Sequence, residues 1–119
     1  MRVVPEVPRY IDVQGRQIAV DEQGFLIDPG QWTEEVAAFM ADQLDVTLTP
    51  AHWTVIRFMR DRLEETQISP DARHAFRYLE AGLAGANGKK LFFELFPKGY
   101  VSQACRIAGM RQPRAWSTG

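Results

Sequence analysis

Residues 95–109 read LFPKGYVSQACRIAG and contain Cys105, the only cysteine among the 119 residues of the chain. Pro97 and Gly99 interrupt regular structure early in this stretch, and Gly109 is the residue type that most often follows the end of a helix. The sequence between these breaks predicts a final helix over residues 99–108. Cys105 would lie one turn after Val101 on that helix, beside an apolar stripe.

The single thiol limits the chemistry of this helix. Cys105 cannot form a disulfide within the chain, so it either carries sulfur, pairs with a partner protein or fills space. Cysteine is often a small buried side chain, and an unperturbed thiol with a pKa of about 8.5 is only a few per cent thiolate at neutral pH. Fast reaction would require exposure or a cationic neighbour. The residues alone leave the structural and the reactive interpretation open.

The N-terminal third of the chain predicts a small antiparallel unit. Residues 10–13 and 17–20 alternate apolar and polar side chains on either side of a turn at Gly15, which is the pattern of a β-hairpin. A second turn at residues 21–24 leads to a third short strand, residues 25–27.

Helices are predicted for most of the remaining chain. Thr33 is a suitable N-cap for the first one, and residues 49–50, Thr-Pro, combine an N-cap with proline at the first helical position. Residues 69–70, Ser-Pro, repeat this signal, so the second and third helices would form a helix-turn-helix. The apolar face of the third helix runs over residues 75–83, and a short fourth helix follows over residues 89–96.

These elements predict an α+β, mostly helical domain, with an N-terminal β-hairpin packed on about five helices. A chain of 119 residues is the size of one domain. We expect a leader over residues 1–9, the folded domain over residues 10–109 and a flexible C-terminal arm over residues 110–119. The arm is expected to be loose because it has a proline and no apolar periodicity.

The composition excludes several classes of protein. A formal net charge of −1 excludes a broadly basic nucleic-acid-binding domain and gives no reason to expect a membrane-surface protein. No apolar run approaches the ~20 residues that cross a bilayer, and the first eight residues contain no apolar signal region. A lone cysteine fits a reducing compartment, so we expect a cytoplasmic protein with no membrane contact.

The charge near the C-terminus is more informative than the net charge of the whole chain. Residues 97–119 contain no acidic side chain and four basic ones, Lys98, Arg106, Arg111 and Arg114. This end could attract an acidic surface or an anion, and the alternative is a solvated tail. Trp116, near Arg114, could anchor in a pocket of a partner. The candidate partner-binding residues are Lys98, Arg111, Arg114 and Trp116.

Other patterns carry less chemistry. His52 and His74 are too few and too scattered to predict a zinc site with Cys105, so no metal and no cofactor are expected. The glycine-rich residues 82–90 lack the spacing of a phosphate-binding loop. Five arginines of the helix-turn-helix could contact DNA phosphates: Arg57, Arg60, Arg62, Arg73 and Arg77. Acidic residues are interleaved with them, so DNA is a less favoured partner than protein.

Residues 95–109 resemble the signature of the DsrC/TusE family of sulfur relay proteins, which includes the gamma subunit of dissimilatory sulfite reductase. The resemblance continues in residues 49–60, TPAHWTVIRFMR, and in residues 69–73, SPDAR, and covers most of residues 10–113. It implies a carrier or partner protein without turnover of its own. The implied partners are a sulfurtransferase complex of the TusBCD or DsrEFH type, acting toward 2-thiouridine in tRNA, or a dissimilatory sulfite reductase-like protein.

The chain departs from the family pattern near the expected chemistry. Relatives carry a second cysteine on the arm, eleven positions after the place of Cys105, and this chain has Trp116 there. Tyr100 stands where relatives have proline. The resemblance places Cys105 in a cleft, as the only thiol that can carry sulfur, and Arg73 near it as the candidate partner of a thiolate or anion. The alternative function is a regulatory or interaction module that binds protein or DNA without transferring sulfur.

Overall fold

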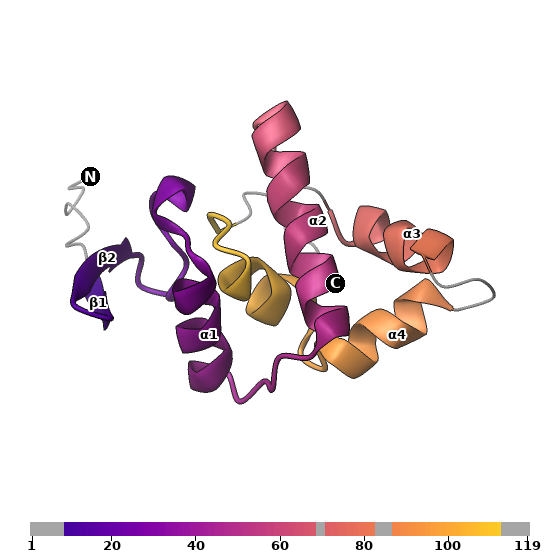
Figure 1. Cartoon of the computed structure of the whole chain (residues 1–119), viewed down its shortest axis with the longest axis horizontal. Coiled ribbons are helices and arrows are strands. Elements are labelled where there is room, and N and C mark those ends of the chain that lie inside the picture. The colour runs from indigo at the N-terminus through magenta and orange to yellow at the C-terminus, as the bar shows by residue number, and fades with distance from the viewer. Residues whose placement is uncertain (1–8, 69–70, 83–86, 113–119) are drawn as a thin grey trace, which may run out of the picture.

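The computed structural model of the protein describes residues 9–68, 71–82 and 87–112 (Figure 1). An antiparallel hairpin at one end consists of β1 (Arg9–Val13) and β2 (Arg16–Val20). Four α-helices follow in chain order: α1 (Glu34–Gln43), α2 (Pro50–Thr66), α3 (Ala72–Gly82) and α4 (Gly88–Leu95). Two short helical segments complete the described elements: the 3-10 turn η1 (Pro29–Gln31) and the π-helical η2 (Tyr100–Cys105). The predicted α+β, mostly helical fold is confirmed.

The predicted hairpin is present, and its turn consists of two residues, since β2 already begins at Arg16. Gln14 and Gly15 both have positive φ angles, 51° and 83°, a combination that matches the twist of the paired strands. Residues 25–27 were also expected to form a strand, but only one bridge, between Val20 and Leu26, forms there. The carboxylate of Asp21 accepts hydrogen bonds from two following backbone N–H groups, which keeps this segment in a turn instead of a ladder.

Side-chain caps begin the helices. The Thr33 hydroxyl accepts from the N–H of Val36 and starts α1, and Thr49 starts α2 as predicted. In α3 the cap is Asp71, whose carboxylate accepts from the His74 N–H at 3.2 Å, while the Asp71 N–H donates to His74 Nδ1 at 3.2 Å. The predicted Ser-Pro start of this helix, residues 69–70, lies outside the described residues.

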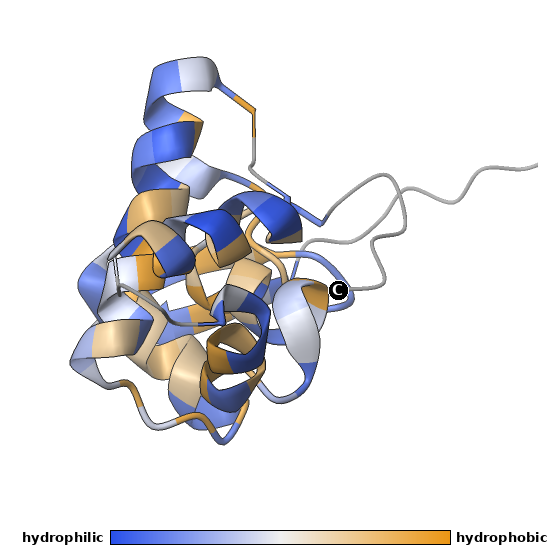
Figure 2. Ribbon diagram, turned by 90° about the vertical axis from the view of Figure 1, so that its right-hand side faces the viewer, coloured by the Kyte–Doolittle hydropathy of each residue, from blue (hydrophilic) through white to orange (hydrophobic). Residues whose placement is uncertain are grey.

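The segment that follows α4 is the centre of the core. Figure 1 shows it, in gold, between α1 and α2. Six of its side chains are 0% exposed: Phe96, Ala104, Cys105, Ile107, Ala108 and Met110. Apolar ribbon segments meet in this interior, while the outer turns of α2 are polar (Figure 2). Within the described residues, no helix is both long and apolar enough to cross a membrane.

The predicted last helix, residues 99–108, is largely π-helical in the structure. Gly99 precedes it with φ +96°, and η2 then runs through Cys105 before a short α-helical turn. A π-helix repeats its hydrogen bonds every five residues, one residue more than an α-helix. Residues five apart, such as Tyr100 and Cys105, are therefore brought to the same side of the segment.

Candidate functional site

Cys105 and Tyr100 form a buried polar pair on η2. Cys105 is 0% exposed and Tyr100 is 2% exposed, and their side chains are hydrogen-bonded to each other. The ring of Tyr100 also lies 6.1 Å from the ring of Phe92, between centroids, so an aromatic side chain packs against one member of the pair. The candidate sulfur carrier therefore lies inside the core, and solvent does not reach it.

Burial determines the ionisation of this pair. Loss of solvation raises the pKa of Cys105 to about 12, against a smaller opposing effect of the Tyr100 hydrogen bond. The pKa of Tyr100 is also raised, first by burial and then by Cys105 and by the charge of Asp71. Both groups are thus neutral at physiological pH. A neutral thiol is a poor nucleophile, so the site does not activate Cys105.

Arg73, the candidate cation, lies on the surface. Its side chain is 81% exposed and its guanidinium pairs with the carboxylate of Asp71 at 3.3 Å. Burial acts to raise the pKa of Asp71, but the hydrogen bonds and charges of His74 and Arg73 lower it overall. The groups that shift the pKa of Cys105 do not include Arg73. Arg73 therefore acts on Asp71 and not on the thiol.

The backbone after Cys105 is held by Arg60 of α2. Its guanidinium donates to the carbonyl oxygens of Ala108 at 3.2 Å, Gly109 at 3.5 Å and Pro29 at 3.0 Å. It also stacks over the ring of Trp32, 4.8 Å from the centroid. Burial lowers the pKa of Arg60, and the charge of Glu64 acts in the opposite direction. Arg60 therefore ties α2, η1 and the C-terminal segment together.

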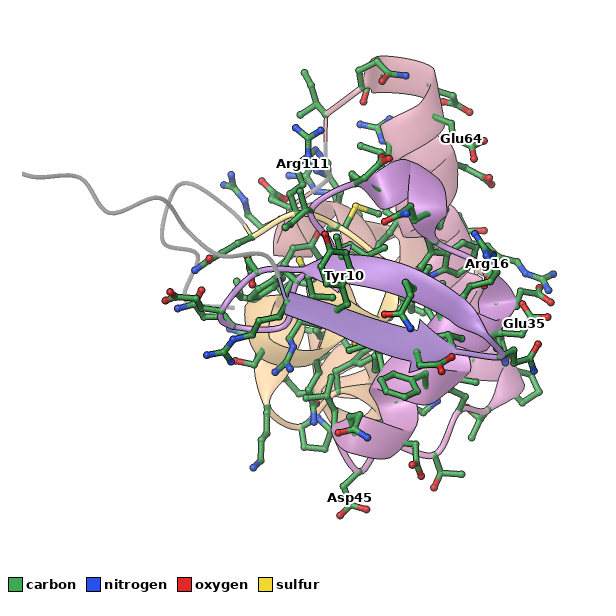
Figure 3. All side chains as sticks on the ribbon, turned by 90° about the vertical axis from the view of Figure 1, so that its left-hand side faces the viewer. Tyr10, Arg16, Glu35, Asp45, Glu64 and Arg111 are labelled. Atoms are coloured by element: carbon green, nitrogen blue, oxygen red, sulfur yellow. The ribbon has the colours of Figure 1, made fainter. Side chains whose placement is uncertain are left out.

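Trp32 and Arg111 make two further hydrogen bonds between the C-terminal segment and earlier parts of the chain. The indole Nε1 of Trp32 donates to the carbonyl of Ile107 at 2.9 Å, and Arg111 Nε donates to the carbonyl of Ile27 at 3.1 Å. Figure 3 shows Arg111 on the side of the molecule that carries the hairpin and Tyr10. The arm was expected to be loose from residue 110, but Met110 is fully buried. The folded unit therefore extends through Arg111.

Among the other predicted partner-binding residues, only Lys98 belongs to the described part of the chain. Lys98 is exposed and lines a hollow at the end of α4. Arg114 and Trp116 lie outside the described residues. Within the described part of the chain, no group of three or more His, Cys, Asp or Glu side chains is arranged to hold a metal ion.

Sequence reasoning missed the roles of three residues at this site. Tyr100 was noted only as a replacement of proline, Arg60 was assigned to phosphate contacts, and Trp32 was not singled out. The sequence around Arg60 gives no signal for its carbonyl partners, because these lie 31 to 49 residues away in the chain. The spacing of five residues between Tyr100 and Cys105 indicates a contact between them only if the segment is expected to be a π-helix.

Comparisons with known proteins match most of the chain. The family model of DsrC like proteins matches residues 12–115. "Sulfurtransferase TusE" of Pectobacterium atrosepticum is 36% identical over 104 residues, which cover 87% of this chain and 95% of that protein. "Sulfurtransferase TusE" of Escherichia coli K12 is 36% identical over 105 residues, covering 84% and 93%.

Two solved structures share the fold. The NMR structure of Allochromatium vinosum DsrC has a TM-score of 0.81 and 38% identity, covering 93% of this chain and 100% of that one. The crystal structure of the oxidised gamma subunit of the dissimilatory sulfite reductase (DsrC) from Archaeoglobus fulgidus has a TM-score of 0.82 and 32% identity, covering 92% and 100%. With a family match over most of its length and relatives above 30% identity, this chain belongs to the DsrC/TusE family.

Proposed function

We propose that this protein acts in sulfur relay as a binding member of the system, docking on a sulfur-handling partner, while Cys105 remains a structural thiol. Relatives named "Sulfurtransferase TusE" and the gamma subunit of dissimilatory sulfite reductase support the metabolic setting. The proposed partner is a sulfurtransferase complex of the TusBCD or DsrEFH type, or a dissimilatory sulfite reductase-like protein. The proposed compartment is the cytoplasm, where a lone thiol stays reduced.

The observation that carries the proposal is the state of Cys105. Sulfur transfer requires a thiolate that attacks the outer sulfur of a persulfide on another protein. Cys105 is 0% exposed and its pKa is raised to about 12, so it meets neither the requirement for access nor the one for ionisation. Eleven positions later, where relatives are expected to carry a thiol on the arm, this chain has Trp116.

Partner binding is proposed for the basic C-terminal region. Lys98 and Arg111 are exposed in the structure. Arg114 extends the same unbalanced positive charge along the chain, and Trp116 adds an aromatic side chain. Arginine and tryptophan are the residue types that contribute most to binding energy at interfaces. An acidic surface on the partner would match them.

DNA binding through the helix-turn-helix is the weaker alternative. Three of its arginines already have partners in the structure: Arg57 pairs with Glu34 at 3.3 Å, Arg73 pairs with Asp71, and Arg60 binds backbone carbonyls. Arg60 is therefore removed from the set of residues proposed to contact phosphate. A basic stripe across α2 and α3 would be needed for tight DNA binding.

The experiment that tests the proposal is intact-mass spectrometry after incubation with a persulfide-charged sulfurtransferase. We expect no gain of sulfur by this chain or by its Cys105→Ser variant, in conditions where a relative with both cysteines gains one sulfur. A sulfur adduct on the wild type that is missing in Cys105→Ser would refute the structural role of the thiol and establish Cys105 as a carrier.

A competition assay tests the binding part separately. Unlabelled chain is added to a preformed complex between the sulfurtransferase donor and a labelled two-cysteine relative. We expect displacement of the relative by the wild type and by Cys105→Ser equally, because the thiol is buried. Failure of both to displace it, at concentrations well above those at which the relative binds, would remove the docking proposal for that partner.

A further inference from the structure

A hollow of about 310 Å³ lies between the α1–α2 connection and the end of α4, apart from Cys105. Two buried polar residues line it, His52 at 6% exposure and Gln103 at 3%. Exposed Glu94 and Lys98 form part of its rim. The volume is at the lower end of the range for small-molecule sites, which begins near ~300 Å³.

His52 is a wall of this hollow and not a free ligand-binding group. The Thr49 N–H donates to His52 Nδ1 at 3.1 Å, so the ring proton resides on Nε2. Nε2 then donates to the carbonyl of Leu95 at 2.7 Å. Both ring nitrogens are occupied, and the imidazole fixes the end of α4 against the start of α2.

Gln103 differs because only one end of its amide is occupied. Its Oε1 accepts a hydrogen bond from the Lys98 N–H at 3.0 Å, which sets the orientation of the amide. No acceptor for its Nε2 occurs among the residues that the structure describes, and this nitrogen is not among the solvent-excluded unpaired atoms, Arg60 Nε and Arg106 Nε. The Nε2 atom of Gln103 therefore contacts solvent, and it does so in the hollow that Gln103 lines.

The rim carries both signs of charge. Neither the Lys98 ammonium nor the Glu94 carboxylate makes an ion pair within the described part of the chain. Asp45 also lines the hollow, but Figure 3 shows its side chain projecting outward beyond the end of α1. The remaining lining is largely apolar, with Leu44 and Leu95 as examples.

We propose that this hollow binds a small zwitterion of the amino-acid class, with its carboxylate on Gln103 Nε2 and Lys98 and its ammonium toward Glu94. A buried amide donor beside a cation suits a carboxylate oxygen. Glu94 on the same rim disfavours a ligand with negative charge alone and favours one that also carries a positive group. The apolar lining accommodates an aliphatic side chain.

The test is a titration of ¹⁵N-labelled full-length protein followed by NMR. The probes are L-leucine and its two singly charged analogues, 4-methylpentanoate and 3-methylbutylamine, each taken into the millimolar range. We expect leucine to shift the side-chain NH₂ signals of Gln103 and the backbone signal of Lys98 in a saturable way. Each analogue should bind severalfold more weakly, because each lacks one of the two charge contacts.

Variants assign the binding to the hollow. Lys98→Met retains the backbone N–H that holds Gln103 and removes the ammonium, so leucine should bind severalfold more weakly. Lys90→Met is the matched control, since Lys90 is an exposed lysine of α4 that does not line the hollow, and it should bind like wild type. The proposal is overturned if leucine produces no saturable shift, if the carboxylate alone binds as well, or if Lys98→Met binds unchanged. None of these outcomes bears on the sulfur-relay proposal, which rests on Cys105.

Discussion

The hydroxyl of Tyr100 and the thiol of Cys105 are hydrogen-bonded to each other inside the core, five residues apart on a π-helical segment. Both groups are buried, and the contact with Tyr100 gives the buried thiol a hydrogen-bond partner. The pair therefore explains how the structure accommodates a cysteine and a tyrosine at its centre. It also explains why the thiol remains protonated: burial outweighs the hydrogen bond that would favour the thiolate.

Native Cys105 should resist alkylation at neutral pH. Its pKa is raised from 9.0 to about 12, and three pKa units correspond to about a thousandfold smaller thiolate fraction. We expect iodoacetamide to modify the folded protein at least that much more slowly than the protein unfolded in guanidinium. Mass spectrometry over time measures both rates. A native rate close to the unfolded one would contradict the buried, protonated thiol.

Replacement of Tyr100 by phenylalanine tests the pair directly. The hydrogen bond from Tyr100 lowers the pKa of Cys105, so Tyr100→Phe should raise it further and should not speed alkylation. The loss of a buried hydrogen bond should cost about 1 kcal/mol of unfolding free energy. Alkylation followed from neutral to alkaline pH, together with urea unfolding, measures the two effects. Faster alkylation in a variant of nearly wild-type stability would mean that Tyr100 shields the thiol by its hydroxyl alone.

Alkaline pH should destabilise the protein through Cys105. Because the folded pKa is raised above the ordinary value of 9.0, the stabilising effect is fully present below pH 9. It is lost as pH rises from 9 toward about 12, since the unfolded state ionises first. Each pH unit in this window should cost about 1.4 kcal/mol from this group. Urea unfolding at several pH values measures this loss. The unfolding free energy should fall less steeply with pH in Cys105→Ala than in the wild type, and equal slopes would contradict the raised pKa of Cys105.

Local chemistry allowed part of the fold to be predicted. Thr33 and Thr49 cap helices through their own hydroxyls, and the Gln14–Gly15 turn follows from positive φ angles, so each depends on a few neighbouring residues. Asp71 caps α3, because its carboxylate and His74 satisfy each other reciprocally. Both residues were visible in the sequence, but serine followed by proline is the stronger local signal.

The candidate site was less predictable because it depends on contacts between distant parts of the chain. The burial of Met110 follows from the hydrogen bonds of Arg60 and Trp32 to the preceding backbone, and these residues precede it by 50 and 78 positions in the numbering of the chain. No periodicity in residues 110–119 indicates this. The π-helix also changes which side chains share a face, so a pattern based on 3.6 residues per turn does not pair Tyr100 with Cys105.

The guanidinium of Arg60 should contribute strongly to stability. Arg60→Met leaves the carbonyls of Pro29, Ala108 and Gly109 without their donor, which should cost about 2–4 kcal/mol. Arg57→Met is the matched control on the same helix, because Arg57 makes an exposed ion pair with Glu34 that is worth less than about 1 kcal/mol. Urea unfolding compares the two. Hydrogen exchange of the Met110 N–H, which donates to Cys105, should also accelerate in Arg60→Met beyond the change in global stability.

The fold should require glycine at position 109, four residues after Cys105, because the backbone there is left-handed. Gly109 has φ +73°, and an added Cβ would collide with the side chain of Trp32. Gly109→Ala should therefore lower the unfolding free energy by about 1–3 kcal/mol, from backbone strain and displacement of the indole together. Gly82→Ala is the control, since nothing lies within 4 Å of a Cβ there, and in a helix it should be neutral or stabilising by up to about 1 kcal/mol. Trp32 also holds Ile107, so Gly109→Ala should increase alkylation of Cys105 and Gly82→Ala should not. If both alanine variants leave the alkylation rate unchanged, the packing of Trp32 on Gly109 does not contribute to the protection of the thiol.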